Sequence, residues 1–186
     1  MNTPPRQKLQ IFTDEGTHVP PSFHKGCLIR VAESLLSDYG WGKVGSRKSE
    51  VGSKRQETRS KKGLPPQRYS ASGEVVLVLT DDATLHGMNR RYRGIDRPTD
   101  VLSFDVTDDD EATGEVYVSL PTAERQASEF GVPVVEELYR LFLHGLLHIT
   151  GRDDQTEEEA AAMMQETERY LGCLMDFVKE CDLRRG

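Results

Sequence analysis

The sequence contains no long apolar run and few cysteine or aromatic residues. All of its apolar stretches fall short of the roughly 18 residues that identify a membrane-spanning helix, which argues against a helical membrane protein. Residues 1–6 are polar and show no signal-peptide pattern. We therefore expect a cytoplasmic protein with no membrane partner.

Only three cysteines are present, Cys27, Cys173 and Cys181, and no two of them are separated by two residues. An odd number of cysteines in a chain without an export pattern is typical of reduced thiols. We interpret the three as mostly buried thiols and assign no metal to them.

The size and composition of the chain suit one compact unit. The chain has 186 residues, of which 36% are hydrophobic and 30% are charged. A chain of this length suits one domain, or one domain with an insertion, and can bury a single core. We predict a single domain over residues 1–186, with a basic, flexible insertion at residues 42–72.

The charge of the chain is unevenly distributed. The net charge is −7, but residues 41–70 hold nine basic and two acidic residues, a net charge of +7, which leaves −14 for the remainder. One interpretation is a solvated loop. The other is a flexible basic arm that contacts the phosphates of a nucleic acid, because Lys and Arg supply the sequence-independent part of such binding. The two interpretations are compatible, since such an arm can be disordered until it binds.

Residues 144–154 place side chains that commonly bind metals close together in the sequence. His144 and His148 are four residues apart, so on a helix they lie on the same face. Gly151 favours the end of that helix, and the turn can bring Asp153 or Asp154 back towards the histidines. Two imidazoles and one carboxylate leave a tetrahedral position open, as catalytic zinc sites do.

The residue after the first histidine argues against a peptidase. In zinc peptidases of the His-Glu-x-x-His type, that position is a glutamate that serves as general base. Here it is Gly145. His144 and His148 could also be ordinary helix residues, but the glycine break followed by two aspartates favours a metal site.

Periodicity and turn residues predict an alternation of strands and helices. The predicted strands span residues 8–13, 74–79, 101–106 and 115–120, with an acidic turn at 108–114. The predicted helices run from Ser22 to Tyr39, from Thr80 or Asp81 through Tyr92, from Pro121 to Gly131, from Pro133 through the two histidines, and from Thr156 to Leu171, where Gly172 ends the last one. We therefore expect an α+β fold (an α/β sandwich) with a mixed sheet of about four strands.

Two motifs follow one another along the chain. The first is Pro-Thr-Asp-Val-Leu-Ser-Phe at residues 98–104, preceded by Asn89, Tyr92 and Arg93. The second is His-Gly-Leu-Leu-His-Ile-Thr-Gly-Arg-Asp at residues 144–153. Together with Gly-Glu-Val-Tyr-Val-Ser at 114–119, they resemble the YbeY family of endoribonucleases and rRNA maturation factors, and the resemblance covers essentially residues 8–172.

The resemblance implies a zinc-dependent-hydrolase-like domain that cleaves single-stranded RNA. It implies a role in 16S rRNA 3′-end maturation and ribosome quality control, with rRNA and the small ribosomal subunit as partners. It implies one Zn²⁺ per chain on His144, His148 and Asp154, with Arg93 as the phosphate-binding catalytic residue. Further candidate RNA contacts are basic residues, namely Arg90, Arg91, Lys54, Arg55, Lys61 and Lys62.

The chain departs from the family pattern at the metal motif. Arg152 stands where the family usually has tyrosine, and Asp154 stands where it has a third histidine. Aspartate is a competent zinc ligand, and its charge improves the relative affinity for harder divalent ions. The alternatives are a non-catalytic ribosome-associated zinc protein and a metallohydrolase of another substrate. The sequence predicts no oligomeric state and no general base.

Overall fold

The computed structural model describes residues 8–14, 17–39, 73–106 and 112–184. The basic segment at 42–72, with its candidate RNA contacts Lys54, Arg55, Lys61 and Lys62, lies outside the described residues, as does most of the predicted acidic turn. Within the described part, no helix is both long enough and apolar enough to cross a membrane.

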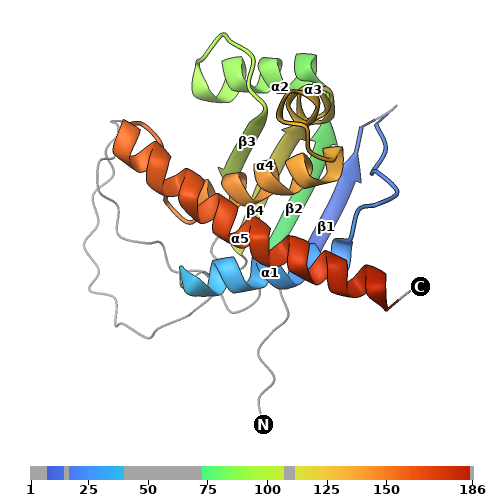
Figure 1. The fold of residues 1–186 in the computed structure, drawn as a ribbon. Coiled ribbons are helices and arrows are strands. Elements are labelled where there is room, and N and C mark those ends of the chain that lie inside the picture. Colours follow the sequence, from blue (N-terminus) through green and yellow to red (C-terminus); the bar gives the residue numbers. More distant parts are fainter. Residues whose placement is uncertain (1–7, 15–16, 40–72, 107–111, 185–186) are drawn as a thin grey trace, which may run out of the picture.

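A four-stranded mixed sheet forms one layer of the structure (Figure 1). Its strands are β1 (Lys8–Thr13), β2 (Gly73–Thr80), β3 (Val101–Asp105) and β4 (Ala112–Ser119), in the order β1-β2-β4-β3. β1, β2 and β4 are parallel, and β3 pairs with β4 in the antiparallel direction at the edge of the sheet. The predicted mixed sheet and α+β class are confirmed.

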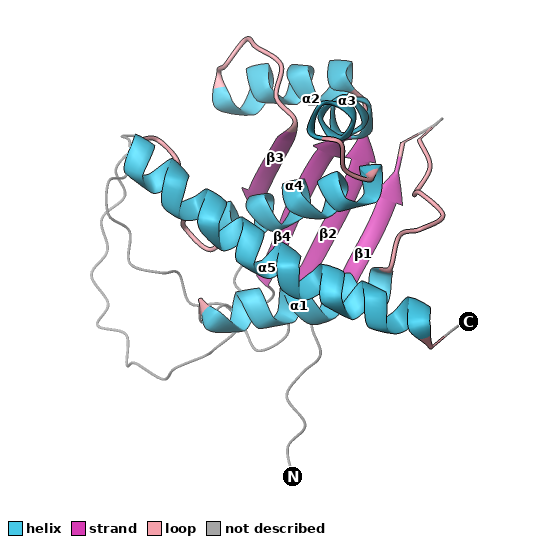
Figure 2. Ribbon diagram, in the orientation of Figure 1, coloured by secondary structure: helices cyan, strands magenta, loops and turns pink. Residues whose placement is uncertain are grey.

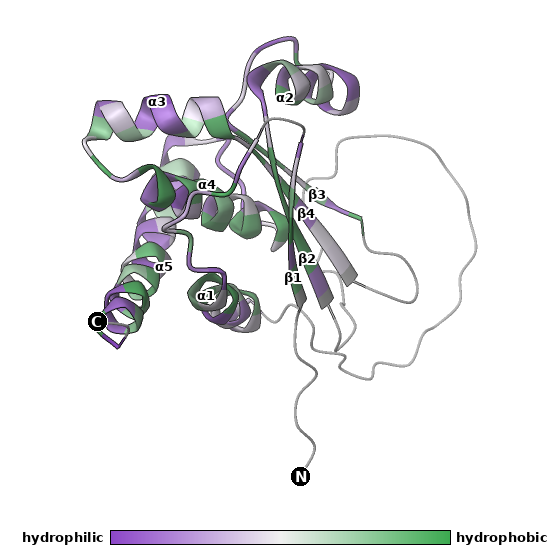
Figure 3. Ribbon diagram, turned by 90° about the vertical axis from the view of Figure 1, so that its right-hand side faces the viewer, coloured by the Kyte–Doolittle hydropathy of each residue, from purple (hydrophilic) through white to green (hydrophobic). Residues whose placement is uncertain are grey.

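Helices form the second layer. They are α1 (Lys25–Asp38), α2 (Asp82–Met88), the π-helical turn η1 (Asn89–Arg93), α3 (Leu120–Phe130), α4 (Val134–Ile149) and α5 (Glu157–Leu183). Figure 2 shows α2 and α3 at one end of the sheet, and Figure 3 shows α1, α4 and α5 on one side of it. Of the other face, η1 reaches the part at β3, where Tyr92 contacts Phe104.

The core lies between the sheet and α4. Alternate residues of β2 and β4 are buried on the helix side, including Leu77, Val116 and Val118 at 0% exposure. α4 is buried around most of its circumference, as a central helix must be, and Gly145 packs closely against the sheet. A Cβ at Gly145 would lie 2.6 Å from Val116 Cγ1 and 3.2 Å from Val101 Cγ2. The glycine is therefore required by close packing of α4 on β3 and β4.

The start of α1 differs from the prediction. Ser22 lies in a turn, and α1 begins at Lys25 with His24 as its N-cap and no side-chain capping bond. The backbone N–H of His24 donates to the Tyr139 hydroxyl of α4 at 2.6 Å. A long-range contact therefore sets this end of α1, and the local capping signal at Ser22 does not.

The predicted end of α5 at Gly172 is wrong, because the helix continues to Leu183. Beyond the glycine, one face of α5 packs on α1. Leu174 is fully buried, the Arg30 guanidinium lies 4.5 Å from the Phe177 ring centroid, and Cys181 Sγ lies 3.2 Å from Cys27 Sγ. An interior glycine costs a helix about 1 kcal/mol relative to alanine. The packing of α5 on α1 outweighs this cost.

Smaller differences occur at two other boundaries. β4 begins at Ala112, three residues before the predicted start, and Leu120 opens α3. The predicted cap at Asp81 is confirmed, because its Oδ1 accepts from the Thr84 N–H at 2.7 Å.

Candidate metal centre and arginine pocket

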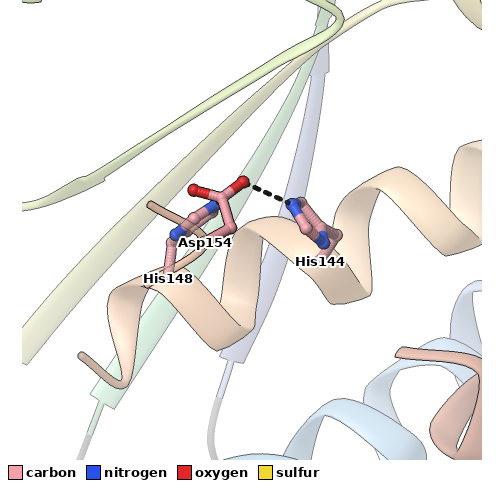
Figure 4. A group of neighbouring side chains, drawn as sticks. All are labelled: His144, His148 and Asp154. Carbon is pink, nitrogen blue, oxygen red and sulfur yellow. Dashed lines mark ion pairs between the residues drawn. The ribbon is translucent and has the colours of Figure 1, made fainter. Parts of the chain in front are cut away.

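The end of α4 brings His144, His148 and Asp154 together (Figure 4). The two imidazole ring centroids are 4.9 Å apart. After α4, Gly151 adopts a φ of 88°, in the left-handed region that favours glycine. The turn then returns Asp154, whose Oδ2 lies 3.9 Å from His144 Nε2 and 3.8 Å from His148 Nε2. Of the two aspartates that the sequence left open, the structure brings Asp154 to the histidines.

The three donor atoms fit a small divalent ion. They all lie within 4.8 Å of one another. Donors bound at ~2.0–2.1 Å to a tetrahedral ion are separated by roughly 3.4 Å, so each carboxylate–imidazole distance needs to shorten by only about half an ångström. The side chains are 22%, 19% and 45% exposed for His144, His148 and Asp154. This partial exposure leaves one side of the cluster open to a substrate.

The surroundings of His144 and a contact of His148 both suit metal binding. Burial, and then the charge of His148, lowers the pKa of His144, which favours the neutral form that binds metals. His148 Nδ1 lies 3.1 Å from the carbonyl oxygen of Arg152. Because a carbonyl oxygen only accepts, this contact places the proton of a neutral imidazole on Nδ1 and leaves Nε2, the atom nearer to Asp154, as the ligand atom.

The side chain of Arg152 fastens the ligand-bearing turn to two helices. Its Nη2 and Nε donate to Glu166 Oε2 of α5 at 2.7 and 3.2 Å, and to the Tyr39 hydroxyl at 3.3 and 3.4 Å. Tyr39 also donates to Glu166. We call this group of three residues the Arg152 clasp. It holds the turn between His148 and Asp154 against α5 and the end of α1.

A pocket of about 510 Å³ lies beside this cluster, and we call it the arginine pocket. Its lining includes three guanidinium groups, those of Arg93, Arg97 and Arg125, and the Asp100 carboxylate. Asp100 is close enough to His144 to act on the pKa of that imidazole. The full lining is Asn89, Arg93, Ile95, Arg97, Pro98, Thr99, Asp100, Thr122, Arg125 and Gln126.

Two arginines of the pocket are available for an anion. Arg125 pairs with Asp82 at 2.9 Å, whereas no carboxylate in the described ranges lies within ion-pair distance of Arg93 or Arg97. The pocket also contains one unsatisfied acceptor. Gln126 donates from Nε2 to Asp100 at 3.0 Å, which turns its buried Oε1 away, and that oxygen has no partner among the described residues.

The position of Gly145 also bears on the chemistry. A Cβ at residue 145 would already lie 2.6 Å from Val116 Cγ1 of the sheet, so a longer side chain has no room at this position. The local backbone therefore offers no place for the glutamate of a zinc peptidase. The sequence-based argument against peptide hydrolysis gains a steric reason.

Sequence reasoning found the local part of the site and missed the distant part. His144, His148 and Asp154 are close in sequence and formed a recognisable pattern. Arg97 directly precedes the motif at 98–104, and this position was its only sequence signal. Arg125 and Glu166 carried no signal, because each reaches the site only through the packing of α3 or α5.

Comparisons with known proteins identify the family. A family model described as Endoribonuclease YbeY matches residues 47–174, a match that begins within the basic segment. The Endoribonuclease YbeY of Pelotomaculum thermopropionicum is 44% identical over 119 residues, which cover 60% of this chain and 78% of the relative. Those of Desulforamulus reducens and Gloeobacter violaceus are each 40% identical, over 62% and 65% of this chain and 81% and 67% of the relatives.

A solved structure shares the fold. The solution structure of TM1509 from Thermotoga maritima aligns with a TM-score of 0.51 over 92% of each chain, at 21% identity. That identity supports the fold alone. The family match covers more than half of the chain, and the chain therefore belongs to the YbeY family of endoribonucleases.

Proposed function

We propose that this chain is a metal-dependent, single-strand-specific endoribonuclease that acts in 16S rRNA 3′-end maturation and ribosome quality control. One observation carries the proposal: three metal-ligand side chains converge beside a pocket that contains two arginines without ion pairs in the described structure. Family membership supports the ribonuclease activity. The proposed partners are rRNA and the small ribosomal subunit, which place the activity in the cytoplasm.

Each residue of the site has a distinct proposed role. His144, His148 and Asp154 would hold one divalent ion, with Zn²⁺ as the first expectation. When bound, such an ion supplies Lewis-acid polarisation of a phosphoryl oxygen. The planar guanidinium of Arg93 contacts the non-bridging oxygens of the scissile phosphate. Since Arg93 has no ion pair among the described residues, binding a phosphate there breaks no existing pair.

The charge of Asp154 shapes the metal preference. A carboxylate in place of a third imidazole adds one negative charge and a hard oxygen donor. Harder ions such as Mn²⁺ then become relatively better bound than at a site of three histidines. Arg90 and Arg91, with the basic residues of 42–72, are proposed to extend the RNA-binding surface.

Metal content and RNA cleavage, measured on the same preparations, test the proposal. We expect about one metal ion per wild-type chain by mass spectrometry and cleavage of a single-stranded oligoribonucleotide. Asp154→Ala should lose both properties, whereas Asp176→Ala, which removes an exposed aspartate farther along the chain on α5, should keep both. Arg93→Ala should keep the metal and lose cleavage.

Other outcomes would overturn individual parts of the proposed function. A wild-type chain that binds no divalent ion would refute metal dependence. Co-sedimentation with the small ribosomal subunit without any cleavage would favour a non-catalytic ribosome-associated protein, and turnover of peptides would favour another metallohydrolase.

A further inference from the structure

Three aromatic rings form a ladder on the sheet face opposite α4. The ring centroids of Tyr92 and Phe104 are 5.5 Å apart at 72°, and those of Phe104 and Tyr117 are 5.8 Å apart at 80°. Both geometries are the favourable edge-to-face arrangement. We call these three residues the aromatic ladder.

Strand register sets the face of the ladder. Val101 and Val116 point at Gly145 of α4, so the alternate residues of β3 and β4 point away from the helices. Phe104 is one of these residues, and it pairs with Glu115, whose carboxylate accepts from the Tyr117 hydroxyl at 2.9 Å. Phe104 and Tyr117 therefore lie on the face of the sheet opposite α4, where Tyr92 of η1 contacts Phe104.

Tyr92 is the exposed end of the ladder. Its side chain is 59% exposed, whereas Phe104 and Tyr117 are partly buried. The edge contact with Phe104 fixes its orientation, and the tyrosine belongs to the π-helical turn η1. Such turns are frequent at functional sites. A fixed and exposed aromatic ring offers a flat apolar surface at little entropic cost.

Positive charge surrounds this ring. Arg91 places its guanidinium 5.4 Å from the Tyr92 ring centroid, and Arg90 is also exposed. Arg93, the next residue after Tyr92, lines the arginine pocket. Among the described residues, no carboxylate is paired with any of these three arginines. An exposed aromatic ring among unpaired cations matches a planar ring joined to phosphates and does not match an apolar or cationic protein surface.

We propose that Tyr92 stacks on a base of single-stranded RNA while Arg91 and Arg93 contact the adjacent phosphates. This inference rests on the proposed ribonuclease function and identifies a substrate-binding residue for it. Stacking on aromatic side chains combined with a cationic groove is the general mode of sequence-tolerant single-strand binding. A base inside a duplex already stacks on its neighbours, so stacking on Tyr92 selects unpaired RNA.

The test compares three variants for binding to a short fluorescent oligoribonucleotide and to its duplex. Tyr92→Leu keeps an apolar side chain but removes the stacking ring, and should weaken single-strand affinity at least about fivefold. Its duplex affinity and the salt dependence of binding should stay unchanged, because the arginines remain. Tyr92→Phe, which keeps the ring, should bind as wild type does. Phe130→Leu removes another exposed aromatic ring, 64% exposed on α3, and should have no effect.

A second measurement does not depend on the stability of a variant. Photocrosslinking of a 5-iodouridine oligoribonucleotide to wild-type protein should label Tyr92 in peptide maps. Wild-type affinity in Tyr92→Leu, or an equal loss for single strand and duplex, would overturn the inference. So would a loss of self-association in Tyr92→Leu without a change in RNA binding. If wild-type protein neither binds nor cleaves RNA, the proposed function itself fails.

Discussion

Replacing Gly145 by alanine tests whether the close approach of α4 to the sheet controls the stability of the domain. The added Cβ would meet Val116 Cγ1 at 2.6 Å, whereas carbon atoms pack favourably at about 3.5–4.0 Å. Val116 is fully buried in a central strand, so neither side can yield without moving an element by about 1 Å. Overpacking of this kind costs about 1–3 kcal/mol.

A second helical glycine provides the control. A Cβ at Gly172 of α5 would meet nothing within 4 Å, so Gly172→Ala should stabilise the chain by about 1 kcal/mol through helix propensity alone. Gly145→Ala has the same gain in helix propensity. The difference in the free energy of unfolding between the two variants therefore isolates the cost of the packing clash at residue 145. A difference of about 2 kcal/mol separates their Tm values by about 4–8 °C for a domain of this size.

Thermal and urea unfolding of both variants would measure this difference. Adding Val116→Ala to Gly145→Ala removes the methyl groups that clash, so the double variant should be more stable than the sum of the single changes predicts. Because Gly145 follows His144, Gly145→Ala should also weaken metal affinity. If Gly145→Ala is as stable as Gly172→Ala, the close-approach argument is refuted.

Two further predictions concern the clasp and the acid stability of the domain. Glu166→Gln removes the charge that pairs with Arg152 and should lower metal affinity on the order of 10-fold, measured by chelator competition. Glu168→Gln, which loses an ion pair elsewhere on α5, should leave metal affinity unchanged. Equal metal affinities of the two variants would show that the Arg152 clasp does not position the metal ligands. Hydrogen bonds from Ser119 and Thr122, and then Arg125, lower the pKa of Asp82 to about 2 from 3.8, so its stabilisation is complete above about pH 4 and is lost as the pH falls to about 2. Asp82→Asn should therefore lower the free energy of unfolding by about 1 kcal/mol at pH 7, a value reduced because the Asp82 side chain is 40% exposed. Near pH 2 the loss should be much smaller. A difference between the variant and wild type that does not change with pH in urea unfolding would contradict this prediction.

The sequence predicted those elements whose signals are local. The apolar run at 74–79 gave β2, and the spacing of His144 and His148 gave the helix and two of the three donors. The turn at Gly151 left Asp153 and Asp154 as candidates for the third donor, and the family resemblance selected Asp154, which the structure brings to the histidines.

Long-range contacts explain what the sequence did not predict. Gly172 is a strong local stop signal, but packing of α5 on α1 overrides it. Ser22 is a good cap, but Tyr139 binds the backbone of His24 and sets the helix start. Arg125 reaches the arginine pocket only because α3 packs across the end of the sheet. The sequence around Arg125 contains no local pattern that predicts this packing.

The position of β3 at the edge of the sheet has a mechanical consequence. Val101 faces α4, the helix that carries the histidines, and Phe104 belongs to the aromatic ladder on the other side of the strand. An RNA that reaches both the histidines of α4 and the aromatic ladder has to bend sharply around β3, within the thickness of the sheet. A single RNA strand can turn around each of its backbone bonds, whereas a stacked duplex resists bending over tens of base pairs. The edge of the sheet would thus reject stiff substrates even where their charge is favourable.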